Sequence, residues 1–115
     1  MNLIYKMDKQ KQLDEVLHAK LNLETAQMSW KDLERFFASG ALIFVGHELD
    51  LVDVAVQIAN DNKQTIEQWL RLGSIAKVTD DQALVWHEAD ISLWTVVVKP
   101  WILVQEDKAA PAALH

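Results

Sequence analysis

The chain has 115 residues, half of them hydrophobic, which suits one folded domain and is too short for two. It contains no cysteine, and this excludes disulfides, thiolate zinc sites and cysteine nucleophiles. Its formal net charge is −6, which disfavours a polyanionic partner such as nucleic acid.

The N-terminal third of the sequence predicts two helices. We expect residues 1–8 to form a flexible N-terminus and residues 9–105 to form the single folded domain. After residue 9, apolar residues recur at helical spacing, at Leu13, Val16, Leu17 and Leu21. Ser29 then predicts the N-cap of a second helix, and Gly40 stands where a left-handed residue would end it.

The middle of the sequence mixes strands and helices. The short apolar run 41–45 predicts a buried strand. Residues 50–60 fit two patterns, because their valines alternate as in a strand while their polar residues form a helical stripe. We interpret this segment as a buried helix capped by Asp50. Asp61 then has the spacing of a capping residue for a further helix that ends at Gly73.

The C-terminal third predicts a short strand, a helix and a long strand. The short strand covers residues 75–78, and Thr79, with a glutamine three residues later, predicts a capping box. Residues 93–104 form the strongest strand signal, β-branched and aromatic throughout. Pro100 cannot donate to a ladder, so we expect a bulge there or an edge strand. Residues 106–115 are expected to be a disordered tail.

Together these elements predict an α+β domain with about five helices and a small three-stranded sheet. Over residues 29–104 their order also matches that of a winged helix. In this alternative the candidate DNA contacts lie on one exposed helix: Lys63, Gln64, Gln68 and Arg71. Against it, residues 41–105 carry nine acidic and four basic side chains, too few cations to neutralise phosphates well.

Histidines and carboxylates cluster at two places, around His47 and Glu48 and at His87, Glu88 and Asp90. Neither place has a second histidine at the spacing usual for zinc, and acidic residues commonly cap helices at element boundaries. We therefore expect no metal and no cofactor, with a small-molecule or metal site at the second place as an alternative. No nucleophile elbow, P-loop or dinucleotide motif occurs, so the sequence predicts no enzyme.

The last strand is apolar on both of its faces. A chain of this size would have difficulty covering both faces with its own helices. We therefore expect a homodimer, or contact with another protein, through one surface of this strand. The candidate surface comprises Trp94, Val96, Val98, Trp101 and Leu103.

Several segments resemble a known protein family. They are Leu21–Ala26, Ser29-Trp30, Leu33, Phe36-Phe37, Leu49–Ala55, Trp69-Leu70 and Val96–Gln105. Over roughly residues 15–106 the chain is similar to small bacterial proteins known only as domain of unknown function 2288. The resemblance implies a single compact domain from a bacterial cytoplasm. It implies no catalytic residues, because that family has no assigned activity.

The sequence thus predicts a soluble, cytoplasmic interaction or regulatory module without catalytic activity, which self-associates through its last strand. A winged-helix DNA-binding regulator and a small-molecule or metal-binding protein are the alternatives. No apolar run approaches the ~20 residues that a membrane span needs, so no membrane partner is expected.

Overall fold

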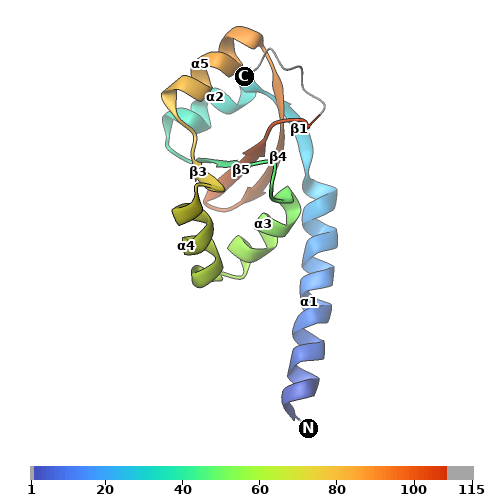
Figure 1. Ribbon diagram of the computed structural model, residues 1–115. Coiled ribbons are helices and arrows are strands. Elements are labelled where there is room, and N and C mark those ends of the chain that lie inside the picture. The colour runs from blue at the N-terminus through green and yellow to red at the C-terminus, as the bar shows by residue number, and fades with distance from the viewer. Residues whose placement is uncertain (1, 109–115) are drawn as a thin grey trace.

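A five-stranded mixed sheet forms the centre of the molecule, with helices on both of its faces (Figure 1). The structure is a computed structural model that describes residues 2–108. Its elements in chain order are α1 (Asn2–Glu24), β1 (Ala26–Ser29), α2 (Trp30–Ala38), β2 (Leu42–Val45), α3 (Leu51–Ala59), α4 (Lys63–Leu72), β3 (Ile75–Lys77), α5 (Asp80–Ala89), β4 (Ser92–Val98) and β5 (Trp101–Gln105). The predicted α+β class is confirmed, whereas the predicted three-stranded sheet is wrong.

The first of the two strands that the prediction omitted arises from residues 93–104, which were predicted to form one long strand. These residues form two strands, because the chain reverses at Lys99 and Pro100 and β5 returns antiparallel to β4. Trp94 lies opposite Gln105 at the open end of this hairpin. Pro100 therefore lies in the turn between the two strands, where its missing N–H costs no ladder bond, and it marks neither a bulge nor an edge.

The second strand that the prediction omitted is β1, which pairs antiparallel with β4, from Ala26 opposite Thr95 to Ser29 opposite Ser92. Its four residues, Ala-Gln-Met-Ser, include no β-branched or aromatic side chain, so they carry no strand signal. Pairing with β4, and not the β propensity of its own residues, therefore makes this segment a strand.

The strand order is β1-β4-β5-β2-β3, and all pairs are antiparallel except β5 with β2. In that parallel pair Leu42 lies opposite Ile102 and Phe44 opposite Val104. β5 is therefore in the middle of the sheet and has a neighbour on each side.

Two apolar cores lie on opposite faces of the sheet. The first packs α1, α3 and part of α4 against residues such as Ile43 and Leu103. The second packs α2 and α5 against residues such as Leu42 and Ile102. Neighbouring residues of one strand point to opposite faces, so β2 and β5 each contribute to both cores. The chain's own helices thus cover both faces of β5, the second part of the predicted last strand.

The local signals for helix ends are mostly confirmed. Ser29 Oγ accepts from the Asp32 N–H at 3.4 Å, and Thr79 forms the predicted capping box that begins α5. Residues 50–60 contain helix α3 rather than a strand. The predicted cap at Asp61 is wrong: α4 begins after Asn62, whose side chain makes no capping hydrogen bond.

Helix α1 differs most from expectation at the N-terminus. The segment 1–8, predicted to be flexible, is helical from residue 2. The C-terminal half of α1 packs on the first core through Leu17 and Leu21, and its N-terminal half extends beyond the body of the molecule (Figure 1). Within residues 2–108, no helix has the length and hydropathy to cross a membrane. Of the predicted tail, residues 109–115 lie outside the described residues.

Because the sheet is covered on both faces, truncating a leucine on β5 should lower the free energy of unfolding more than truncating an exposed leucine. Leu103 is fully buried on β5, and we expect Leu103→Ala to lower the free energy of unfolding by ~3 kcal/mol because it leaves a cavity. Leu23, which is 86% exposed on α1, is the matched control, and Leu23→Ala should change it by less than ~0.5 kcal/mol. Urea unfolding measures both, and equal losses would contradict the central position of β5.

Candidate functional site

The five residues of the interaction surface predicted on the last strand differ widely in burial. Val96 and Leu103 are buried in the first core, and Val98 and Trp101 are half-buried beside it. Trp94 is the most exposed of the five, at 38%. The five side chains therefore do not form one open apolar surface.

A groove of about 510 Å³ lies between α4 and the sheet, bordered by β3 and the β4–β5 turn. Its volume falls in the range of small-molecule sites. Its apolar lining comprises Ile43, Ile58, Ile66, Leu70, Ile75 and Trp101, with Pro100 at the turn. Its charged lining comprises Asp61, Lys63, Glu67, Lys77 and Lys99. We call this site the lysine groove.

The groove stays open because α4 is not packed tightly on the sheet. None of the side chains of α4 is fully buried, and its contacts with the first core come from the half-buried Ile66 and Trp69. Leu70 borders the groove and is 51% exposed. Within residues 9–108, no side-chain hydrogen bond or ion pair joins α4 to another helix or strand. Apolar contact therefore holds α4 in place and leaves room beneath it.

Most of the basic side chains of residues 41–105 lie at this groove. Residues 41–105 contain four bases, and three of them, Lys63, Lys77 and Lys99, line it. The Lys77 ammonium lies 4.8 Å from the centroid of the Trp101 ring and donates a hydrogen bond to the Gly40 carbonyl. Such a cation–π contact contributes about 0.5–1 kcal/mol at an exposed position. Lys77 is therefore held in position at the mouth of the groove.

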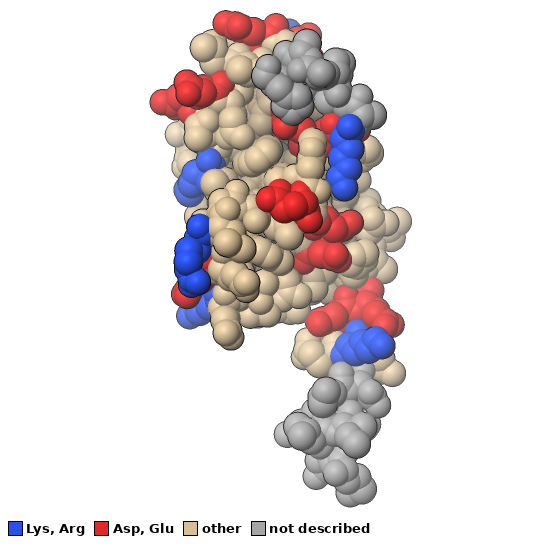
Figure 2. Space-filling model, in the orientation of Figure 1, with Lys and Arg blue, Asp and Glu red and all other residues tan. Residues whose placement is uncertain are grey.

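The two walls of the lysine groove differ in charge. The wall from the α3–α4 turn and α4 carries Asp61, Lys63 and Glu67, whereas the sheet wall carries Lys77 and Lys99 and no acid. In Figure 2, blue side chains line the left edge of the body at the height of α4 and β3, while the middle of that face shows acidic side chains. The sheet wall of the groove is thus locally cationic on a protein of negative net charge.

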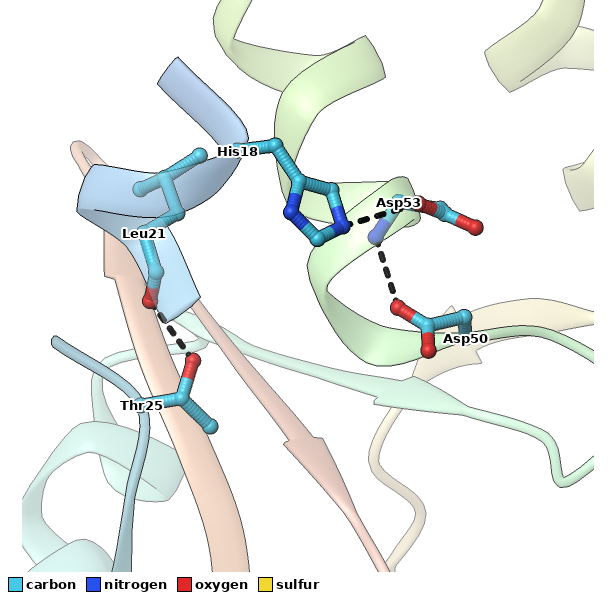
Figure 3. A network of polar contacts seen from close by, with 5 residues as sticks. All are labelled: His18, Leu21, Thr25, Asp50 and Asp53. Carbon is cyan, nitrogen blue, oxygen red and sulfur yellow. Dashed lines mark hydrogen bonds and ion pairs between the residues drawn. The ribbon is translucent and has the colours of Figure 1, made fainter. Parts of the chain in front are cut away.

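A second polar cluster joins α1 to the first turn of α3 (Figure 3). His18 Nε2 lies 3.2 Å from Asp53 Oδ1, and Asp50 Oδ1 accepts from the Asp53 N–H at 3.0 Å. One ligand atom from each of these residues lies within 4.8 Å of the others, a spacing that could hold a cation. However, the capping of α3 by Asp50 and the contact between two helices account for all three side chains.

Sequence reasoning did not single out His18. It is 35 positions from Asp53, and the packing of α1 on α3 alone brings them together. Asp50 had been identified as the cap of its helix, which is confirmed.

The histidine clusters expected from the sequence are not assembled. His87 Nδ1 lies 3.1 Å from Glu34 Oε1 on α2, while Asp90 is the left-handed C-cap of α5. His47 Nε2 contacts the backbone carbonyl of Glu106 at 2.9 Å. In the described part of the chain, neither place gathers three metal ligands.

The candidate DNA contacts are all exposed and all lie on α4: Lys63, Gln64, Gln68 and Arg71. Lys63 belongs to the lysine groove, with Glu67 one turn further along the helix. The exposed residues of α4 therefore include two cations at most for a phosphate backbone.

Comparison with known proteins places the chain in a family. The family model DUF2288, described as a protein of unknown function, matches residues 16–106. The chain belongs to the DUF2288 family. It is also similar to PA1075 from Pseudomonas aeruginosa, whose solution structure was determined by NMR. The two are 46% identical with a TM-score of 0.71, over 84% of this chain and 91% of PA1075. No curated protein matches this DUF2288 protein.

The predicted resemblance is thereby confirmed, and it brings no assigned activity. The match includes every residue of the lysine groove and of the His18 cluster. It leaves out the N-terminal half of α1.

If capping explains the His18 cluster, the shape of residue 50 matters more than its charge. Asp50→Ala should lower the free energy of unfolding by ~1 kcal/mol because it removes the N-cap acceptor of α3. Asp50→Asn keeps an acceptor oxygen and should cost much less. Thermal or urea unfolding of the two variants decides, and an Asn variant as unstable as the Ala variant would show that the carboxylate charge is what matters.

Proposed function

We propose that this DUF2288 protein is a non-catalytic, cytoplasmic binding module that takes a small, largely apolar ligand into the lysine groove. The observation that carries the proposal is an open groove of about 510 Å³ with six large apolar side chains in its lining. Small-molecule sites combine such a lining with a few polar groups that orient the ligand. The loose packing of α4 supports the same role, because a ligand beneath the helix would bury Leu70, which lines the groove and is 51% exposed.

A binding role is favoured over a catalytic one by the side chains of the groove. Its five charged residues, three lysines and two acids, form no hydrogen bond or ion pair with one another in the described part of the chain. Acid–base and nucleophilic catalysis require paired groups within hydrogen-bond reach. The hydroxyls of Ser29 and Ser39 make hydrogen bonds at the ends of α2 instead.

DNA binding through a winged helix has less support. The proposed recognition helix α4 is exposed, as that function requires, but it offers only Lys63 and Arg71 as cations and Glu67 lies between them. Phosphate contacts supply most of the affinity of such proteins, and the whole chain carries −6.

We propose a different surface for self-association from the one that the sequence predicted. The central position of β5 removes the reason for a partner on the last strand. Helix α1 instead exposes Leu13, Val16 and Leu23, and its N-terminal end extends beyond the body of the molecule (Figure 1). Isolated helices are marginal in water, so a second copy or another protein packed on α1 would stabilise it.

The neutral fluorophore N-phenyl-1-naphthylamine tests the binding role. It should bind the folded protein with a rise in fluorescence, and Leu70→Glu should weaken binding by ~5-fold or more because it places a charge against the ligand. Leu72→Glu is the matched control, since Leu72 is 67% exposed on the same helix and does not line the groove. Absence of binding, or equal binding by both variants, would remove the proposed function.

Sedimentation velocity tests self-association of the full chain. We expect a dimer that Val16→Glu converts to monomer, because Val16 is exposed on α1 and its replacement leaves the core intact. A monomer at all concentrations would end the idea of a dimer through α1. A dimer that Val16→Glu leaves unchanged would place the interface elsewhere.

A further inference from the structure

The unequal walls of the lysine groove identify the chemical class of its ligand. The sheet wall presents Lys77 from β3 and Lys99 from the β4–β5 turn, with Trp101 two residues beyond Lys99. The opposite wall presents Lys63 together with the carboxylates of Asp61 and Glu67. A negative group in the groove is therefore attracted to the sheet wall and repelled from the α4 wall.

The ammonium group of Lys77 is positioned to bind a negative group. An ammonium has three N–H donors, and the hydrogen bond to the Gly40 carbonyl uses one of them. The Trp101 ring beneath the ammonium restricts its position further. Two donors remain for a ligand, and less side-chain freedom is lost on binding than for an unrestrained lysine.

Lys99 supplies a second positive charge without a competing partner. Its side chain is exposed and forms no hydrogen bond or ion pair within the described residues. A lysine at a turn has little effect on packing, so its place beside the groove is open to ligand contact.

We infer that the ligand is a small organic anion. Its carboxylate or phosphate binds Lys77 and Lys99 at the sheet wall, and its apolar body lies against Trp101, Ile66 and Leu70 beneath α4. This inference rests on the proposed function and adds the charge and the orientation of the ligand. It follows from charge complementarity, because the sheet wall of the groove is cationic in a protein with a net charge of −6.

Three naphthalenes that share one apolar body test the inference on the full chain: 1-naphthoate, 1-naphthyl phosphate and the neutral 1-naphthalenemethanol. Isothermal titration at low salt should give at least one anion an affinity about tenfold or more above that of the alcohol, as charge-assisted hydrogen bonds provide. That advantage should shrink as salt is added. The anion that gains more identifies the preferred headgroup.

Lys99→Glu should abolish the advantage of the anions over 1-naphthalenemethanol. Arg71→Glu is the matched control: it makes the same change in net charge at the one base of residues 41–105 outside the groove, and it should preserve most of the advantage. Equal loss in both variants would show a general field effect and overturn the inference.

The outcomes separate the inference from the function on which it rests. Equal binding of all three naphthalenes would overturn the anion preference and leave an apolar binding module. Failure of all three to bind, together with failure of the neutral fluorophore, would overturn both.

Discussion

Between β2 and β5, hydrogen bonds of a parallel ladder place Leu42 opposite Ile102 and Phe44 opposite Val104, and most of the molecule is organised around this pairing. On the other edge of β5 the chain has reversed at Lys99 and Pro100, so β4 pairs antiparallel with β5. Once β5 lies beside β2, it has neighbours on both edges and an apolar row on each face. Parallel strands are stable when both faces are covered, and the helices on the two sides of the sheet supply that cover.

The same pairing builds the candidate site. The turn that precedes β5 carries Lys99, and the first residue of β5 is Trp101. β3, paired with the other edge of β2, brings Lys77 over the Trp101 ring. Helix α4 completes the groove only in part, since it contacts the core through partly buried side chains. The opening is thus a consequence of a well-packed sheet and a loosely packed helix.

Much of the secondary structure could be predicted from the sequence because its determinants are local. The caps at Ser29, Asp50 and Thr79 depend on residues three positions apart, and the left-handed Gly73 ends α4 as expected. The strand β1 could not be predicted, because its residues lack β-forming side chains and its partner is more than 60 residues away. The hairpin was missed because the apolar run 93–104 continues across the turn.

The site was predictable only in pieces. Lys63 was singled out as a DNA contact and Trp101 as part of a self-association surface, for unrelated reasons. That both line one groove follows from the packing of α4 beside the β4–β5 turn, which no sequence spacing encodes. Lys77 and Lys99 carried no signal of their own, because an isolated lysine in a strand or turn is usually a solvated charge.

Intermolecular nuclear Overhauser effects between bound 1-naphthoate and the full chain test the central claim most directly. The account predicts effects from the naphthalene protons to the Trp101 ring and to the methyl groups of Ile66 and Leu70, three side chains that line the lysine groove. Effects confined to side chains elsewhere, such as those of α1 or α5, would contradict it.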